Sequence, residues 1–191
     1  MKYWQAFTGV LIVTCLAWQV PQSGQPQSRR GYEISDYYRT AFPGSPDVSR
    51  DGKYVAFAVR RYNLQQGKTW SELWIMGPDG SGLRQMTFAD HEDTSPVFSP
   101  DGKRLVFVSD RDGTKPQLFV LALDGGEPRK LTGFPMGVSS PRWSPDGRWI
   151  AVTSHVYPEC GANDDCNRQI DEGLAKDRLQ AHVADGLLYR H

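Results

Sequence analysis

The chain has 191 residues, and its 22 Lys and Arg balance its 22 Asp and Glu, so the formal net charge is zero at pH 7. Without a net field or a clustered basic stripe, this composition argues against a protein that binds nucleic acid. The length suits one ordinary domain, and the 19 Gly and 13 Pro recur at turns rather than in a low-complexity tract.

The N-terminal residues have the pattern of an export signal. Lys2 gives a positive start, and a mostly apolar run of 14 residues follows over 7–20. This run is shorter than the roughly 20 residues that a transmembrane helix needs. We therefore predict a signal peptide over residues 1–24 and a periplasmic or extracellular location. An uncleaved anchor is the alternative, and it would be the only contact of the chain with a membrane.

Three segments of the chain repeat one another. Each holds a Ser-Pro-Asp-Gly turn or a close variant, at residues 49–52, 99–102 and 144–147. Pro fixes φ at the second turn position, Asp caps the backbone and Gly accepts a positive φ. We expect structural turns at Asp51 and Gly52, at Asp101 and Gly102, and at Asp146 and Gly147.

Each repeat offers four candidate strands. In the second repeat they cover residues 96–99, 104–109, 117–123 and 129–131. The runs 55–58 and 105–108 are continuously apolar, which predicts strands that are covered on both faces. The first repeat is five residues longer than the second, and we place the extra residues in a loop around 62–68.

Four-stranded antiparallel units that recur every 45 residues or so and stack face to face are blades of a β-propeller. The predicted fold class is therefore all-β, an incomplete β-propeller of four-stranded antiparallel blades. Residues 25–44 would lead into the propeller, and residues 45–154 would hold two full blades and the start of a third. Closed propellers have about four to eight blades, so we expect the sequence to be a fragment; an assembly of several chains is the alternative. A β-sandwich would not need this self-similarity.

The second repeat, FSPDGKRLVFVSDRDG followed by QLFVLALDGGEPRKLT, resembles the propeller repeat of TolB and of prolyl oligopeptidase family serine peptidases. That repeat is specific for the fold and weak for function. Residues 152–191 interrupt it with a Tyr-Pro-x-Cys…Cys-Asn loop, a charged stretch and Leu-Leu-Tyr-Arg-His. This interruption resembles exported dipeptidyl-peptidases and acylaminoacyl-peptidase-like members. Arg50 departs from the repeat, which usually has Pro there.

The resemblance implies the N-terminal propeller of an exported serine exopeptidase that cleaves short peptides, with the propeller gating and binding the peptide. That family carries its catalytic residues in a C-terminal α/β-hydrolase domain. The sequence contains no Gly-x-Ser-x-Gly nucleophile elbow. We therefore assign no catalytic residue, cofactor or metal, and expect the chain to be inactive by itself, with the peptide meeting the missing hydrolase domain. The alternative is a non-catalytic TolB-like periplasmic propeller that binds a protein.

Residues 155–191 are predicted to form a cysteine loop, a helical insert over 167–184 and the start of the next strand. Cys160 and Cys166 lie in a polar loop of a chain expected to be exported, where oxidising conditions favour a disulfide. Two free thiols are the alternative. Asp171 and Glu172 could recognise a peptide amino group, although a solvated helix face explains them more simply. The Asp-Arg-Asp-Gly segment at 110–113 fits a hairpin turn better than a calcium loop.

Overall fold

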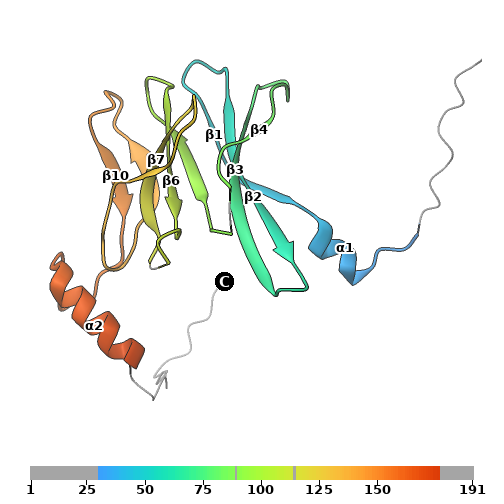
Figure 1. Ribbon diagram of the computed structural model, residues 1–191. Helices are drawn as coiled ribbons and strands as arrows, with labels where there is room; N and C mark the ends of the chain where they lie inside the picture. The colour runs from blue at the N-terminus through green and yellow to red at the C-terminus, as the bar shows by residue number, and fades with distance from the viewer. Residues whose placement is uncertain (1–29, 89, 114, 177–191) are drawn as a thin grey trace, which may run out of the picture. The chain divides into compact units, whose positions relative to one another are not determined.

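The computed structural model describes residues 30–88, 90–113 and 115–176. The signal peptide predicted over residues 1–24 and the strand predicted near the C-terminus lie outside these residues. The described strands form two four-stranded antiparallel sheets and a two-stranded sheet (Figure 1). This arrangement confirms the all-β class and the incomplete β-propeller, whereas the predicted domain boundaries remain predictions.

Blade one is the first four-stranded sheet. A short helix, α1 (Ile34–Arg39), precedes it. The strands of blade one are, in chain order, β1 (Phe42–Val48), β2 (Val55–Asn63), β3 (Lys68–Met76) and β4 (Arg84–Gln85). The rings of Tyr37, Phe42 and Tyr62 lie with centroids 5.4–5.8 Å apart, in the range of favourable aromatic pairs. These contacts hold α1 against the first two strands of the blade.

Blade two repeats the same order with shorter strands. They are β5 (Thr94–Phe98), β6 (Arg104–Ser109), β7 (Gln117–Ala122) and β8 (Arg129–Lys130). Blade three begins with β9 (Ser139–Trp143) and β10 (Ile150–Thr153), and helix α2 (Asp164–Lys176) follows. The strand β5 contacts both β1 and β9, so the first strands of the three blades lie side by side.

The apolar core lies between the blades rather than inside one sheet. Blade one contributes alternate residues of β2 and β3, and blade two contributes alternate residues of β6 and β7. The buried residues at this interface are Ala56, Ala58, Leu73, Ile75, Phe98, Leu105, Phe107, Phe119, Leu121 and Leu123. Fully burying one large apolar side chain stabilises a protein by roughly 1.5–3 kcal/mol. Stacking of the blades therefore contributes to the stability of the fold through these buried side chains.

The central strand β6 is covered on both faces. Leu105 and Phe107 pack toward blade one, whereas Val106 packs with Leu118 and Val138 toward blade three. All four of the apolar residues 105–108 are buried, as the continuous apolar run predicts. In β2, by contrast, Val55 and Phe57 remain half-buried, because among the described sheets only blade two packs against blade one.

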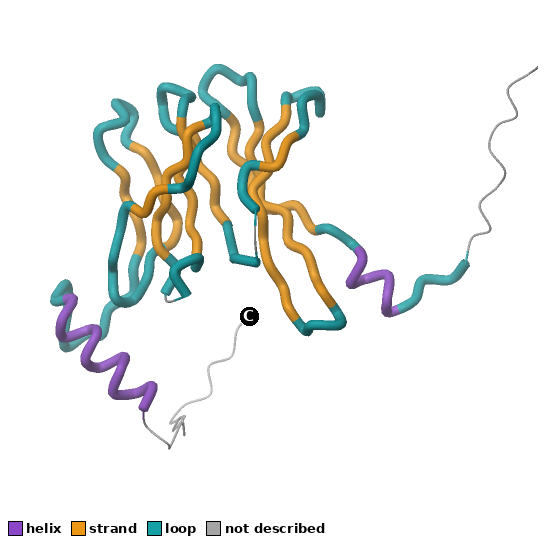
Figure 2. The backbone as a smooth tube through the Cα atoms, in the orientation of Figure 1, coloured by secondary structure: helices purple, strands orange, loops and turns teal. Residues whose placement is uncertain are grey.

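The turns of the blades gather at the two ends of the strands, on opposite sides of the stacked sheets (Figure 2). We call the edge with the three Ser-Pro-Asp-Gly-type turns, at 49–54, 99–104 and 144–149, the turn edge. The opposite edge, which we call the insertion edge, carries the β2–β3 turn at 64–67, the described residues 110–113 and 115–116 between β6 and β7, and the segment 154–163 after β10. Because neighbouring strands of a blade run antiparallel, successive turns lie alternately at the turn edge and at the insertion edge.

The five extra residues of the first repeat do not form the loop that we predicted around 62–68. They lengthen the hairpin instead: β2 runs on to Asn63, β3 starts at Lys68, and pairing continues to the Asn63–Lys68 pair. Only residues 64–67 form the turn. The prediction was wrong in this respect because the inserted residues pair with one another across the two strands, so the insertion extends the sheet.

Candidate functional site

The three repeated turns share one hydrogen-bonding pattern. In the first turn the Ser49 hydroxyl donates to the Asp51 carboxylate at 2.7 Å and accepts from the Tyr54 N–H at 2.9 Å. Asp51 also accepts from the N–H of Lys53, and Gly52 has a φ of 71°. Gly102 and Gly147 have φ values of 67° and 70°, and the same serine–aspartate bond recurs at Asp101 and Asp146.

These contacts lower the pKa of the three turn carboxyl groups. The serine hydroxyl, and after it the backbone N–H two residues on, stabilise the charged carboxylate and hold the pKa of Asp51, Asp101 and Asp146 below the usual 3.8. Each aspartate is thus engaged by its own turn. We infer a structural task for these residues at the turn edge, not proton transfer.

A second repeated feature precedes each turn. Ser45, Ser95 and Ser140 have φ values of 49°, 52° and 51°, in the left-handed region that non-glycine residues rarely adopt. Each lies directly before a proline, and the pairing of its strand shifts register nearby. Such bulges turn the following side chains in a new direction. They place Asp47, Val97 and Arg142, each two residues later, at equivalent positions in β1, β5 and β9.

Polar contacts join blade one to blade two. The Asp47 carboxylate accepts from the Phe98 N–H at 2.8 Å, and Arg84 donates to the carbonyl of Leu123 at 2.7 Å. Ser71 exchanges backbone hydrogen bonds with residues 91 and 93. These bonds fix the register between the two blades, which the non-directional apolar contacts alone would not do.

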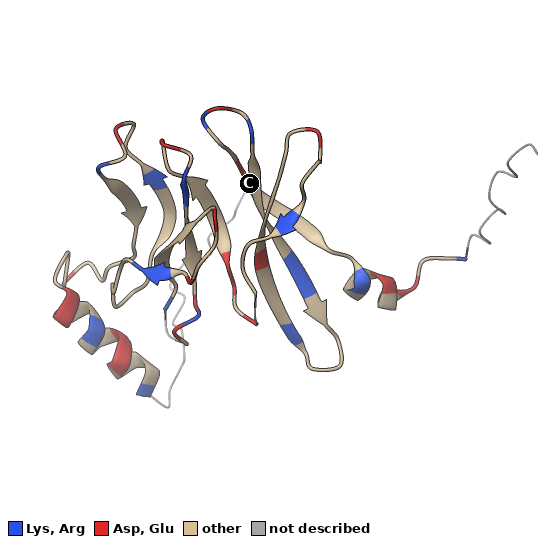
Figure 3. Ribbon diagram, turned by 45° about the horizontal axis from the view of Figure 1, so that its top comes forward, with Lys and Arg blue, Asp and Glu red and all other residues tan. Residues whose placement is uncertain are grey.

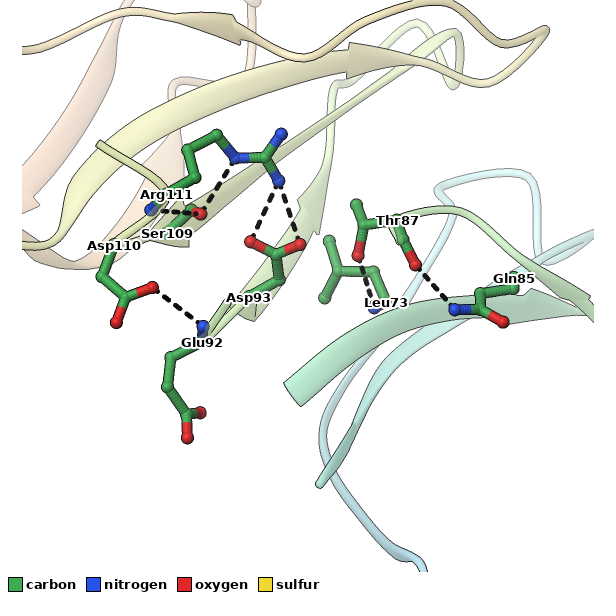
Figure 4. A network of polar contacts seen from close by, with 8 residues as sticks. All are labelled: Leu73, Gln85, Thr87, Glu92, Asp93, Ser109, Asp110 and Arg111. Carbon is green, nitrogen blue, oxygen red and sulfur yellow. Dashed lines mark hydrogen bonds and ion pairs between the residues drawn. The ribbon is translucent and has the colours of Figure 1, made fainter. Parts of the chain in front are cut away.

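A network of charged and polar residues lies near the insertion edge (Figure 4). Arg111 donates to both oxygens of the buried Asp93 at 3.0 Å and to the hydroxyl of Ser109. Asp110 accepts from the N–H of Glu92 at 2.9 Å. Asp112 pairs with Lys130. The acidic residues of the β6–β7 turn are therefore engaged within blade two.

The segment after β10 is organised around Cys160, Cys166 and Asn167. The two cysteines form a disulfide with a Cα–Cα distance of 5.5 Å. Asn167 is 1% exposed; its side chain accepts from the N–H of Tyr157 and donates to the carbonyls of Gly161 and Asn163. Sequence inspection missed Asn167, and its position directly after Cys166 was the available signal.

Helix α2 starts three residues before the predicted position. The Asn163 side chain accepts from the N–H of Cys166 at 3.0 Å and caps the first turn of the helix. Asp171 pairs with Lys115 of the β6–β7 segment at 3.2 Å, and Glu172 pairs with Lys176 at 3.9 Å. Both carboxylates that we considered for a peptide amino group thus have cationic partners in this chain.

A hollow of about 490 Å³ lies at the turn-edge ends of β1, β5 and β9. Its charged lining residues are Asp47, Arg50 and Arg142, and its apolar lining includes Val48, Val97 and Trp143. Arg104 lies over the Trp143 ring at 5.3 Å and holds that wall of the hollow. This concave, partly apolar surface with a few charged groups has the general character of a binding site.

Two of the four histidines of the sequence lie within the described residues. His91 offers its backbone carbonyl to Ser71, His155 is exposed, and His182 and His191 lie outside the described residues. In residues 30–88, 90–113 and 115–176 there is no group of three His, Cys, Asp or Glu side chains arranged for a metal ion. Neither described helix is long and apolar enough to cross a membrane. Positive and negative residues are interspersed over the blades (Figure 3).

Stacked four-stranded blades, repeated turns and a hollow between first strands define the protein class as a β-propeller. The family model of the TolB β-propeller domain matches residues 33–173. The chain belongs to this family.

Two curated relatives are peptidases. The chain is 41% identical over 73 residues to the uncharacterized peptidase YuxL of Bacillus subtilis, which is 38% of the chain and 11% of that protein. It is 34% identical over 67 residues to dipeptidyl-peptidase 5 of Porphyromonas gingivalis, which is 35% of the chain and 10% of that protein. The matched segment thus spans about a tenth of the length of either relative.

Among solved structures, acylaminoacyl peptidase of Pyrococcus horikoshii superposes with a TM-score of 0.51 at 19% identity. The match covers 62% of the chain and 18% of that peptidase. At this level of identity the likeness bears on the fold alone.

Proposed function

We propose that the chain is the N-terminal propeller part of an exported serine exopeptidase that cleaves short peptides. The observation that carries the proposal is the interruption of blade three. After β10 the chain leaves the plain repeat for the disulfide-closed loop and α2, where a propeller without added parts would continue with two more strands. The identities of 41% and 34% to two peptidases support this proposal.

The propeller would gate and bind the peptide. Its blades pack through buried apolar faces, so the surfaces left for a ligand are the two edges and the first strands. The insertion edge carries the long β2–β3 hairpin, the disulfide loop and α2, and Lys115 and Asp171 fasten α2 to blade two. These added segments and the hollow at the turn edge are therefore the parts of the described surface that a peptide could contact.

The chemistry would come from a hydrolase domain outside this chain. Acyl transfer by a serine needs a nucleophile on a sharp turn, a histidine base and an acid to orient the base. The 191 residues contain no such elbow, so the propeller would select and hold the peptide while the other domain cleaves it.

A non-catalytic TolB-like propeller that binds a protein partner is the second candidate. The match to the TolB propeller model over residues 33–173 favours it. On this reading the loop after β10 and α2 would contact the partner directly, and no serine hydrolase activity would accompany the chain.

The experiment compares the 191-residue chain with the full product of the reading frame that contains it. We expect the full product to cleave dipeptidyl 4-nitroanilides and to react with a fluorophosphonate, and the 191-residue chain to do neither. Replacing the elbow serine of the full product by alanine is the matched control and should abolish both signals. A full product that neither cleaves nor reacts would overturn the peptidase proposal and leave the TolB-like one.

A further inference from the structure

The hollow at the turn edge has an excess of positive charge. Three charged residues line it: Asp47 from β1, Arg50 from the first turn and Arg142 from β9. Asp47 already accepts a hydrogen bond from the N–H of Phe98. In the described parts of the chain, neither arginine forms an ion pair with a carboxylate. Two arginines therefore line one concavity with a single, engaged carboxylate.

The other repeats have no arginine at the positions equivalent to Arg50 and Arg142. Arg50 stands where the second and third turns have Pro100 and Pro145. Arg142 stands where β5 has Val97. The turns and strands form with Pro and Val at those sites, so the blade fold does not need either arginine. Two cations that the scaffold does not require therefore line one hollow, from blades one and three.

From this geometry we infer a carboxylate-binding site in which Arg50 and Arg142 hold the terminal or side-chain carboxylate of a short peptide. A guanidinium offers a planar fork of donors that matches a carboxylate. The volume of about 490 Å³ and the apolar walls at Val48, Val97 and Trp143 fit a few residues of peptide next to that group. The peptide nature of the ligand rests on the proposed function, while the anion chemistry rests on the lining residues alone.

The test uses the 191-residue chain and N-acetyl-trialanine, titrated by NMR through the guanidinium Nε–H signals. Acetylation removes the amino charge, so the C-terminal carboxylate is the only ionised group of the probe. We expect binding of this peptide, at least tenfold weaker binding of its C-terminal carboxamide, and weakening of the carboxylate complex as salt is raised.

Arg50→Pro and Arg142→Val restore the residues that blade two has at the equivalent positions. Because those residues are compatible with the turn and the strand, the variants should fold. Each should weaken binding of N-acetyl-trialanine about tenfold, since one charged partner is lost. The matched control is Arg148→Ala, which removes a cation from the third turn outside the lining of the hollow and should leave binding unchanged.

The proposal is overturned if the carboxamide binds as tightly as the carboxylate, or if Arg50→Pro and Arg142→Val bind the peptide like the unaltered chain. It is also overturned if inorganic phosphate binds as tightly as the peptide, because the site would then be a general anion site. The two proposals can fail separately. Loss of the carboxylate-binding proposal would not change the result expected of the full product with the fluorophosphonate. A full product that does not react with the fluorophosphonate would not change whether Arg50 and Arg142 bind a carboxylate.

Discussion

The guanidinium of Arg111 donates two hydrogen bonds of 3.0 Å to the two oxygens of Asp93, a residue that is 2% exposed. Asp93 lies directly before β5, and Arg111 lies in the turn after β6. The guanidinium carbon also lies 5.1 and 4.9 Å from the ring centroids of Phe107 and Phe119. The pair thus ties the start of the first strand of blade two to the insertion edge.

Breaking this pair should destabilise the fold strongly. Arg111→Met keeps most of the packing on the two rings but leaves the Asp93 carboxylate buried without its cation. The expected loss in the free energy of unfolding is about 3–5 kcal/mol, as for other buried pairs that lose one partner. The measurement is urea denaturation of both proteins.

The matched control is Arg168→Met, which breaks the ion pair with Asp165. Both side chains of that pair are more than half exposed, at 51% and 82%, so this change should cost less than about 1 kcal/mol. Equal, small losses in the two variants would show that the Asp93–Arg111 pair does not hold blade two together.

The serine of each repeated turn should contribute to stability, and Ser99 is only 1% exposed. Ser99→Ala removes the donor to Asp101 and the acceptor for the N–H of Arg104. We expect a loss of about 1–2 kcal/mol in the free energy of unfolding. We also expect the pKa of Asp101 to rise toward 3.8, which carbon-detected NMR can measure. Ser139→Ala is the control, since that hydroxyl makes only a 3.5 Å contact. An unchanged pKa of Asp101 would refute this account of the turn.

The repeated turns also predict the direction of the pH dependence. The pKa values of Asp51, Asp101 and Asp146 lie below 3.8 in the folded chain. The unfolded state therefore binds more protons than the folded state as the pH falls toward these values. Their contribution is present above the unfolded pKa and is lost as the pH falls through the folded pKa. Stability should thus be steady from about pH 7 to 5 and fall below about pH 4.

Replacing all three aspartates by asparagine should flatten the acid part of that stability curve, because asparagine does not titrate. Thermal unfolding between pH 3 and pH 7 provides the measurement. If the stability of the triple variant falls below pH 4 as steeply as that of the unaltered chain, the acid sensitivity comes from other carboxyl groups and this prediction is wrong.

Asn167 should control the order of the disulfide loop. Asn167→Ala leaves the Tyr157 N–H and two carbonyls without their partner, and unsatisfied buried groups cost about 1–3 kcal/mol each. Hydrogen exchange of the Tyr157 amide should become at least tenfold faster, while exchange in β6 should not change. Arg168→Ala, which removes an exposed pair with Asp165, is the control. Unchanged exchange at Tyr157 would contradict this role.

The local parts of the fold could be predicted from the sequence because they depend on neighbouring residues. The strand predicted at 104–109 has the bounds of β6, Arg104–Ser109, and the strand predicted at 117–123 differs from β7 by one residue. Turn residues and apolar runs repeat at a fixed period, and both signals are contained in short windows.

The contacts that join distant residues could not be predicted in this way. Asp47 accepts a hydrogen bond from Phe98, 51 residues further along the chain. Arg50 and Arg142 line one hollow only because the first strands of three blades lie side by side. The left-handed Ser95 was also missed, because the residue before a proline normally adopts an extended conformation. The repeated Ser-Pro pairs at 45, 95 and 140 were the signal for that bulge.

The central claim, that this propeller serves a serine exopeptidase, is tested most directly by the DNA sequence of the gene beyond the codon for His191. We expect an open frame that continues through further blades into an α/β-hydrolase domain with Gly-x-Ser-x-Gly, followed by the acid and then the histidine. A stop codon at that point, or a frame that holds only further propeller repeats, would contradict it.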